Sequence, residues 1–241
     1  MTKTESLRKT ARVAGLYYLI VVLTGILSLA YIPSKIVIWD NPVRTWQNIT
    51  NHETLFRIGI VSSIVCYLFF LLLPLALYRL LGGINESAAR LMVLFAVVSV
   101  PISFINIQHK LTVLSLIENP SYLKAFSLDQ LQSQVLFYLN QFENGNLMAS
   151  IFWGLWLFPF GYLVYRSGFI PRILGVLLML GCFGYLTNSL GEIFINNYSA
   201  MGISSYISLP ASIGEIGSCL WLLIFGIKEH TITTKNKSDE E

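Results

Sequence analysis

Apolar residues along this chain gather into six long runs, and more polar stretches separate them. The runs cover residues 14–32, 58–78, 91–107, 147–165, 170–190 and 207–227. Each run is close to the roughly twenty residues that a helix needs to cross a bilayer. The pattern therefore predicts an all-α fold, an integral membrane bundle of six transmembrane helices.

The long connection after the first run contains a helical pattern of its own. Pro42 can open a short helix, on which Val43, Trp46 and Ile49 repeat every third residue as one apolar face. Such a face predicts a short amphipathic helix that lies on the membrane surface.

The connection after the third run contains a second helical pattern. Ser127 and Gln130 have the spacing of a capping box. The apolar stripe that follows consists of Leu128, Leu131, Val135, Tyr138 and Phe142. This stripe predicts another amphipathic helix, which either lies flat in the loop or leads directly into the fourth span.

Lysine and arginine are distributed unequally between the two sides of the predicted bundle. Of these 16 cationic residues, eleven fall on the side of the termini and five on the other side. Because cationic flanks resist translocation, this bias places both the N and the C terminus in the cytoplasm. The two long connections then face outward.

Composition excludes a soluble globular domain. Hydrophobic residues make up 54% of the 241 residues and charged residues only 12%, whereas a soluble domain has about a quarter charged residues. No connection is long enough to fold separately, so we predict one six-helix membrane domain over residues 1–230. The polar tail, residues 231–241, is predicted to be a disordered cytoplasmic segment.

Net charge and cysteine positions limit the expected partners and cofactors. The net charge is only +3, so topology explains the basic residues and nucleic-acid binding has no support. Cys66, Cys182 and Cys219 lie inside apolar runs without CxxC spacing, so we predict no disulfide framework, no metal site and no cofactor. The expected partners are the lipid bilayer and a small-molecule or lipid ligand, and a protein partner is left open.

Polar side chains within the runs repeat every three or four residues, which places them on single helix faces. Glu215 is the most informative of them, because it lies about eight residues inside the sixth run, or about 12 Å deep at 1.5 Å per residue. A bare carboxylate at that depth costs on the order of 2.5 to 3.5 kcal/mol. Glu215 must therefore be protonated, paired or hydrated.

The remaining candidates lie on these polar faces or near the outward ends of the runs. The ligand-binding or ion-pair candidates are Glu215, Arg57, Lys110, His109, Asn106, Glu143, Asn146, Asn188, Glu192, His52 and Glu53. No residue is assigned as catalytic or metal-binding. Arg57, His109 and Lys110 are the candidate partners of Glu215.

Structural explanations compete with several of these assignments. A Glu215–Arg57 salt bridge that only fixes helix packing is weighed evenly against a functional role. For His52, near a predicted helix start, a solvated capping role is preferred over metal ligation. The interfacial aromatic belt is a sufficient explanation of Tyr17, Tyr18, Trp39 and Trp46.

Three classes of function are consistent with these residues. In the first, an outward-facing polar cavity binds or transports a small or amphiphilic molecule, with Glu215 as the proton-titratable group and Arg57 or Lys110 as its counter-charge. In the second, an accessory or sensor subunit uses its buried ion pairs only to hold the bundle together. In the third, an intramembrane enzyme uses His109 or Glu215 as acid or base, although no HExxH or GxSxG pattern is present. We rank them in this order, which favours a protein that is not an enzyme.

The hairpin between the fourth and fifth runs has a structural interpretation. Gly168 permits a positive φ angle, and Pro171 pre-sets the start of the next helix. Arg166 and Arg172 flank the turn, as arginines commonly do at the ends of membrane helices.

Two segments carry a resemblance to a known family. The segment Glu-Thr-Leu-Phe-Arg-Ile-Gly at residues 53–59 and the segment Gly-Tyr-Leu-Val-Tyr-Arg-Ser-Gly-Phe-Ile-Pro-Arg-Ile-Leu-Gly-Val-Leu-Leu at 161–178 resemble the bacterial membrane family of domain of unknown function 4386. The resemblance covers about residues 8–228. It implies a multi-pass protein of the bacterial cytoplasmic (inner) membrane, and it implies no reaction, cofactor or catalytic residue.

Overall fold

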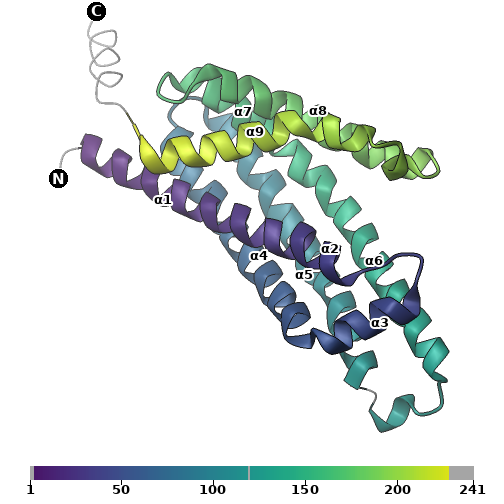
Figure 1. The fold of residues 1–241 in the computed structure, drawn as a ribbon. Coiled ribbons are helices and arrows are strands. Elements are labelled where there is room, and N and C mark those ends of the chain that lie inside the picture. The colour runs from purple at the N-terminus through teal and green to yellow at the C-terminus, as the bar shows by residue number, and fades with distance from the viewer. Residues whose placement is uncertain (1–2, 119, 228–241) are drawn as a thin grey trace, which may run out of the picture. The chain divides into compact units, whose positions relative to one another are not determined.

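The computed structural model describes residues 3–118 and 120–227, and these residues form a series of helices (Figure 1). The elements in chain order are α1 (Lys3–Gly25), the π-helix η1 (Ile26–Tyr31), α2 (Ile32–Ile36), α3 (Pro42–Asn51), α4 (Glu53–Leu81), α5 (Glu86–Glu118), the 3-10 helix η2 (Ser121–Leu123), α6 (Leu128–Leu155), α7 (Leu157–Ser167), α8 (Arg172–Phe194), the 3-10 helix η3 (Tyr198–Met201) and α9 (Ile203–Ile224).

Six helical segments within the described residues are long and apolar enough to cross a membrane, as the sequence predicted. They are Glu5–Ile36, Glu53–Leu81, Glu86–Glu118, Leu128–Ser167, Arg172–Phe194 and Ile203–Ile224. The first four contain 32, 29, 33 and 40 residues, and are longer than predicted because the helices continue past their most apolar residues. The 33 residues of α5 span about 50 Å at 1.5 Å per residue, whereas the hydrocarbon core is about 30 Å thick.

Both connections contain a helix where the sequence predicts one, and in the second connection the structure has one of the two predicted alternatives. Residues 42–51 form the helix α3, where the Asn41 side chain accepts a hydrogen bond from the Arg44 N–H at 2.9 Å. In the other connection, Ser127 and Gln130 form the reciprocal bonds of a capping box at 2.8 and 3.3 Å. The helix that begins there is α6 itself, so the apolar stripe leads directly into the fourth span and no separate amphipathic helix follows the cap.

The chain divides into two compact units, and each is described here by itself. Unit 1 comprises Met1–Leu19, Phe69–Ser99 and Ser150–Glu241, and unit 2 comprises Ile20–Leu68 and Val100–Ala149. The helices α1, α4, α5 and α6 each contribute residues to both units. A single membrane domain over residues 1–230 stays a prediction, and the predicted disordered tail, residues 231–241, lies outside the described residues.

Glycines allow the helices of unit 1 to pack closely. The helices α7, α8 and α9 run alongside one another (Figure 1). A Cβ atom built on Gly175 of α8 would lie 2.6 Å from the carbonyl oxygen of Gly161 on α7, and one on Gly15 of α1 would lie 2.5 Å from the backbone nitrogen of Leu223 on α9. Small residues at such contacts are typical of membrane helices, which gain stability from close van der Waals packing.

The α7–α8 hairpin adopts the backbone that its sequence predicts. Gly168 has a φ angle of 75° and ends α7 in the left-handed region. Pro171 immediately precedes the first residue of α8. The indole N–H of Trp221 on α9 donates to the Phe169 carbonyl at 2.9 Å, so the turn is also held by the helix beside it.

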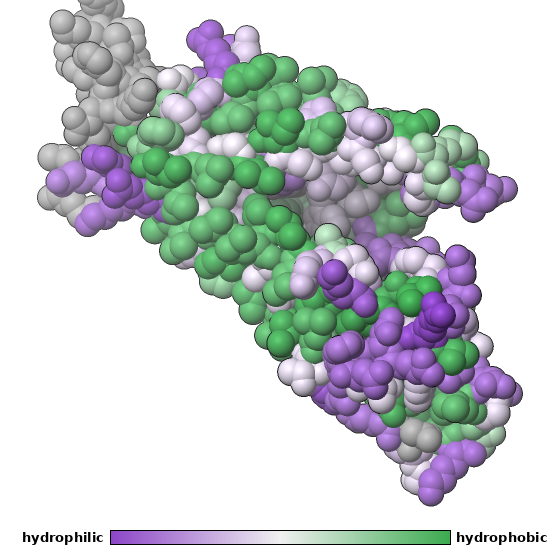
Figure 2. Space-filling view, viewed as in Figure 1, coloured by the Kyte–Doolittle hydropathy of each residue, from purple (hydrophilic) through white to green (hydrophobic). Residues whose placement is uncertain are grey.

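The visible surface of each unit differs in polarity from place to place. Figure 2 shows apolar residues over α9 and the adjoining helices of unit 1, with hydrophilic residues at the start of α1. In unit 2 the hydrophilic residues gather around α3 and the connections near it. Apolar side chains exposed on long helices are the surface that contacts lipid in a multi-pass membrane protein.

Replacing Gly175 with alanine tests the close packing of α7 on α8. The added methyl group meets the Gly161 carbonyl, so we expect Gly175→Ala to lower the unfolding free energy by roughly 1–3 kcal/mol, the usual cost of overpacking. Thermal unfolding in detergent measures the change. Gly83→Ala is the matched control, because a Cβ atom at Gly83 has nothing within 4 Å; equal melting temperatures for the two variants would contradict the prediction.

Candidate functional site

Glu215 lies close to the middle of α9. The helix begins at Ile203, twelve residues before Glu215, so the residue is about 18 Å along the helix at 1.5 Å per residue. This depth exceeds the value of about 12 Å that the predicted helix start implied. The side chain is partly buried within unit 1.

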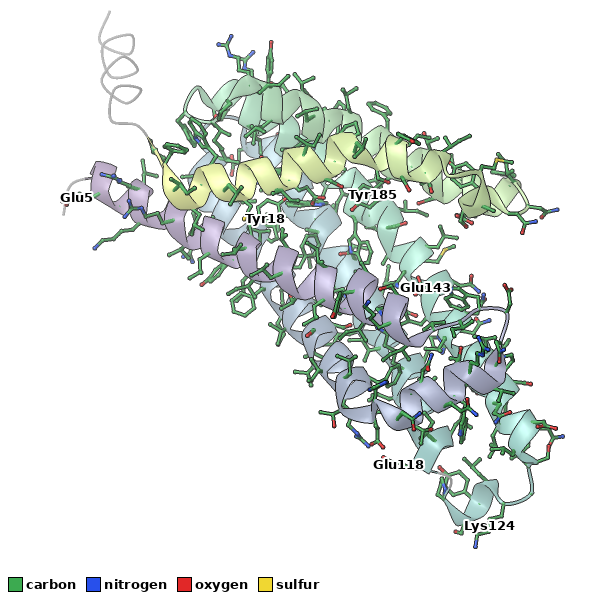
Figure 3. The ribbon with its side chains drawn as sticks, viewed as in Figure 1. Glu5, Tyr18, Glu118, Lys124, Glu143 and Tyr185 are labelled. Atoms are coloured by element: carbon green, nitrogen blue, oxygen red, sulfur yellow. The ribbon has the colours of Figure 1, made fainter. Side chains whose placement is uncertain are left out.

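The phenol of Tyr18 is the hydrogen-bond partner of Glu215. The Tyr18 hydroxyl on α1 donates to Oε1 of Glu215 at 3.1 Å, and the Tyr18 side chain is only 1% exposed. Figure 3 shows Tyr18 on α1 beside α9. Tyr185 of α8 also interacts electrostatically with the carboxylate, so phenols from two helices adjoin the acid.

Aromatic rings continue outward from this pair. The Tyr18 ring centroid is 6.1 Å from that of Trp156 and 6.2 Å from that of Phe160. Trp156 and Phe160 stack with centroids 5.1 Å apart and ring planes 6° from parallel. Aromatic rings therefore contact Tyr18, the residue that donates to the acid.

The helix that carries these rings lacks one backbone hydrogen bond near Trp156, although the backbone of Trp156 keeps helical φ and ψ angles. The span Leu128–Ser167 is divided at Trp156 into α6 and α7. Pro159 follows three residues later, and because proline has no N–H, the Leu155 carbonyl lacks its usual helical donor. Trp156 itself is almost fully buried, so the interruption lies inside unit 1.

The structure corrects the interpretation of Tyr18. The sequence analysis assigned Tyr18 to the interfacial belt, yet its ring is buried and its hydroxyl serves Glu215. A tyrosine in an apolar run carries no local signal that separates these two roles. The only hint in the sequence was Glu215 itself, because a carboxylate in an apolar run needs a hydrogen-bond donor from another span.

Lys110 occupies a different environment in unit 2. The helix α5 continues to Glu118, so Lys110 lies within this helix and not at its end as predicted. Its side chain is only 5% exposed. The ammonium nitrogen is 3.3 Å from the Ser28 carbonyl oxygen and 3.9 Å from the centroid of the Phe142 ring.

Other residues of the predicted α5 and α6 faces do meet. The Asn106 amide donates to the Phe142 carbonyl at 2.8 Å and to Oδ1 of Asn146 at 3.1 Å. His109 stacks on Tyr138, with ring centroids 6.1 Å apart. Asn106 and Asn146, which lie on polar faces that the sequence spacing predicts, therefore contact one another in unit 2.

Glu143 and Lys110 line the same cavity in unit 2. The cavity has a volume of about 20 Å³ and is otherwise bounded mainly by apolar residues of α2, of the segment after α2, of α4 and of α6. A volume of this size holds about one water molecule. Figure 3 shows the position of Glu143 on α6.

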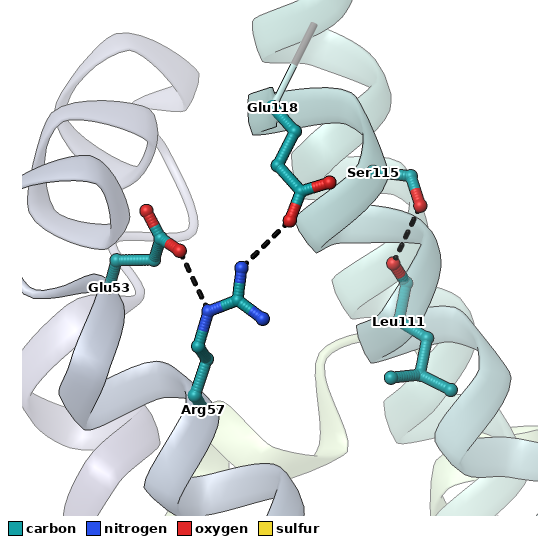
Figure 4. A network of polar contacts seen from close by, with 5 residues as sticks. All are labelled: Glu53, Arg57, Leu111, Ser115 and Glu118. Atoms are coloured by element: carbon teal, nitrogen blue, oxygen red, sulfur yellow. Dashed lines mark hydrogen bonds and ion pairs between the residues drawn. The ribbon is translucent and has the colours of Figure 1, made fainter. Parts of the chain in front are cut away.

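Arg57 has carboxylate partners other than Glu215. Its guanidinium contacts Glu53 and Glu118, each at 2.7 Å (Figure 4), and all three side chains are at least 40% exposed. Glu118 was not among the predicted partners, because no local pattern links the end of α5 to the start of α4. Exposed pairs of this kind contribute little to stability.

His52 and Glu53 lie where α3 turns into α4. His52 closes α3 by donating its backbone N–H to the Asn48 carbonyl at 3.0 Å, and its own carbonyl accepts from Phe56. Both residues line an open depression of about 470 Å³ formed by residues 50–55 and Ile58. His52 thus takes part in the backbone bonds of the corner.

Asn188 and Glu192 belong to a polar cluster at the end of α8. The Asn188 amide donates to the Ser204 carbonyl at 3.1 Å and to the Ser208 hydroxyl at 2.9 Å, and its oxygen accepts from Tyr198 at 2.8 Å. Glu192 accepts from Ser199 at 2.7 Å. These bonds connect α8, η3 and α9 within unit 1.

Histidine, cysteine and carboxylate side chains do not form a metal centre among the residues that the structure describes. No group of three or more of them lies close enough to hold a metal ion there.

Removal of the Tyr18 hydroxyl tests the contact with Glu215. Tyr18→Phe leaves the ring in place and removes the donor, so we expect a loss of roughly 0.5–2 kcal/mol, the range for hydrogen bonds between membrane helices. Unfolding in detergent measures the loss. Tyr17→Phe is the control, since a phenylalanine retains the ring contact of Tyr17 with Phe69; an equal effect of both variants would contradict a specific bond.

Removal of the Arg57 charge tests the ion pairs in Figure 4. Because the three side chains are exposed to solvent, we expect Arg57→Gln to leave the melting temperature almost unchanged. Thermal unfolding at low and at high salt provides the measurement. A large loss at both salt concentrations would show that Arg57 has a structural role that these pairs do not explain.

Comparison with known proteins supports the family but assigns no activity. The model of the family "Domain of unknown function (DUF4386)" matches residues 13–226. An "Uncharacterized protein" of Archaeoglobus fulgidus is 33% identical over 81 residues, which are 34% of this chain. The chain spans 46% of the length of that relative. No solved structure matches the chain.

Proposed function

The chain belongs to the DUF4386 family, and we propose that this multi-pass membrane protein binds and transports a small, positively charged amphiphilic molecule at Glu215. One observation carries the proposal. A carboxylate lies near the middle of a membrane-spanning helix, and its hydrogen bond comes from the neutral phenol of Tyr18. Within the described part of unit 1, no lysine, arginine or histidine forms an ion pair with it.

The position of Glu215 favours an exchange of positive charges. An ionised carboxylate at the centre of a membrane helix costs on the order of 2.5 to 3.5 kcal/mol when nothing neutralises it. A bound proton removes that cost, and so does a bound cation. A group that accepts either species can release a proton when the cation binds, which is the elementary step of proton-coupled exchange.

The groups around Glu215 favour an organic cation. An anion would be repelled by the carboxylate, and a neutral molecule would leave its charge uncompensated. A small metal cation prefers several oxygen ligands, whereas the site offers one carboxylate and phenol groups beside the rings of Trp156 and Phe160. Aromatic faces attract organic ammonium groups by cation–π interaction.

The missing hydrogen bond at Pro159 supports a site that changes shape. A membrane helix that lacks a backbone hydrogen bond at a proline bends more easily there than a regular helix. Trp156 is at the break between α6 and α7, and its ring contacts Tyr18. Movement at the break would move the ring that covers Tyr18 and open a path to the acid.

Topology completes the proposal. The excess of lysine and arginine on the side of the termini supports a cytoplasmic location of both ends. The resemblance of the sequence to bacterial membrane proteins supports the bacterial inner membrane. In that orientation the connection that contains α3 faces outward, and the ligand is proposed to enter from the outer side.

The experiment uses tetraphenylphosphonium, a lipophilic organic cation, as the probe. We expect it to raise the melting temperature of the wild-type protein and to bind more tightly as the pH rises. The sign follows because protons compete for Glu215, and the limiting slope is about tenfold per pH unit for exchange of one proton. Isothermal titration calorimetry in detergent measures the affinity at each pH.

The variant Glu215→Gln removes the charge and keeps the shape of the side chain. We expect it to remain folded and to lose both the binding and its pH dependence. Glu86→Gln is the control, because Glu86 is exposed and paired with Arg90 at 2.6 Å. Unchanged binding to Glu215→Gln, or no binding to the wild type at any pH, would refute the proposal and favour an accessory role.

A further inference from the structure

The regular backbone hydrogen bonding of the first membrane span is broken at the Ser28 carbonyl. Residues 26–31 form the π-helix η1, a rare conformation that often marks functional sites. The backbone N–H of Ile32 donates to the Leu27 carbonyl and not to that of Ser28. The next residue is Pro33, which has no N–H. The positions four and five residues after Ser28 therefore supply no donor to its carbonyl.

Lys110 of α5 takes the place of the missing donor. Its ammonium nitrogen lies 3.3 Å from the Ser28 carbonyl oxygen and 3.9 Å from the centre of the Phe142 ring. A carbonyl oxygen and an aromatic face both carry negative potential. Together they form a site for positive charge, and an anion there would meet repulsion from both.

The charge of Lys110 has no ion-pair partner within the described part of unit 2. Glu143 lines the same cavity of about 20 Å³ and interacts electrostatically with the ammonium, without forming an ion pair with it. The remaining walls include the apolar side chains of Ile32, Ile36 and Leu139. The space left beside the ammonium holds about one water molecule, and the carbonyl and the ring are the groups in direct contact with the charge.

We propose that the opened turn at Ser28 is a binding site for one monovalent cation, and that the Lys110 ammonium is its built-in occupant. The bound ammonium stabilises the π-helical conformation of η1, because its withdrawal would leave the buried Ser28 carbonyl without a hydrogen-bond donor. An uncompensated polar group in a membrane interior costs several kcal/mol. The site is independent of the function proposed for Glu215.

The first test is chemical rescue of Lys110→Ala. This variant empties the site and leaves a space that a short alkylammonium can enter. We expect ethylammonium chloride to raise the melting temperature of Lys110→Ala by several degrees more than tetramethylammonium chloride at the same concentration. The wild type and the control Lys35→Ala, which removes an exposed lysine of α2, are expected to respond equally to both salts. An equal response of Lys110→Ala to both salts would overturn the proposal.

The second test supplies the missing donor from the backbone. Pro33→Ala restores an N–H at position 33, which lets the main chain satisfy the Ser28 carbonyl. We expect the melting temperature to fall less from Lys110→Ala in the Pro33→Ala background than in the wild-type background. This comparison also remains possible if Lys110→Ala alone does not fold, because the double variant is then expected to fold. The proposal would be refuted if the stability loss of the double variant equalled or exceeded the sum of the losses of the two single variants.

Discussion

Charge inside a low-dielectric medium has to be compensated by a neighbouring helix, and this constraint organises both units of the structure. Water cannot reach the centre of a membrane span to solvate an ion. In unit 1 the carboxylate of Glu215 accepts a hydrogen bond from the hydroxyl of Tyr18. In unit 2 the ammonium of Lys110 meets the Ser28 carbonyl and the face of Phe142. In each case the compensating group comes from a helix that is distant in the sequence.

Close approach of the helices makes such contacts possible. In unit 1, Gly15 lies three residues before Tyr18 on α1 and faces the backbone of α9 at Leu223. The Cys219 thiol, one turn after Glu215, lies 3.7 Å from the Gly15 carbonyl. A larger residue at position 15 would separate the two helices at the level where the Tyr18–Glu215 bond forms. Packing by small residues and polar recognition are thus parts of one interface.

Both buried charges lie beside a helix that departs from regular α geometry. The contacts of Glu215 lead through Tyr18 to Trp156, where α6 ends and α7 begins. Lys110 binds the carbonyl that η1 and Pro33 leave without a backbone donor. A regular helix satisfies its own carbonyls and offers none to a cation. The prolines therefore supply what hydrophobic periodicity cannot, namely polar backbone atoms at membrane depth.

The sequence by itself determined the class of the protein, the number of spans and the helix start at Ser127, because these depend on apolar length and on local capping chemistry. It also identified Glu215, since a charge in an apolar run is visible without a structure, and it named Lys110 as a candidate just beyond the third run. Only the tertiary structure decided which groups meet them. Tyr18, Ser28 and Phe142 carry no local signal of their roles, and Arg57 pairs with Glu118 from another helix. The physical reason is that periodicity specifies the faces of a helix, whereas partners depend on which faces the packing of the helices brings together.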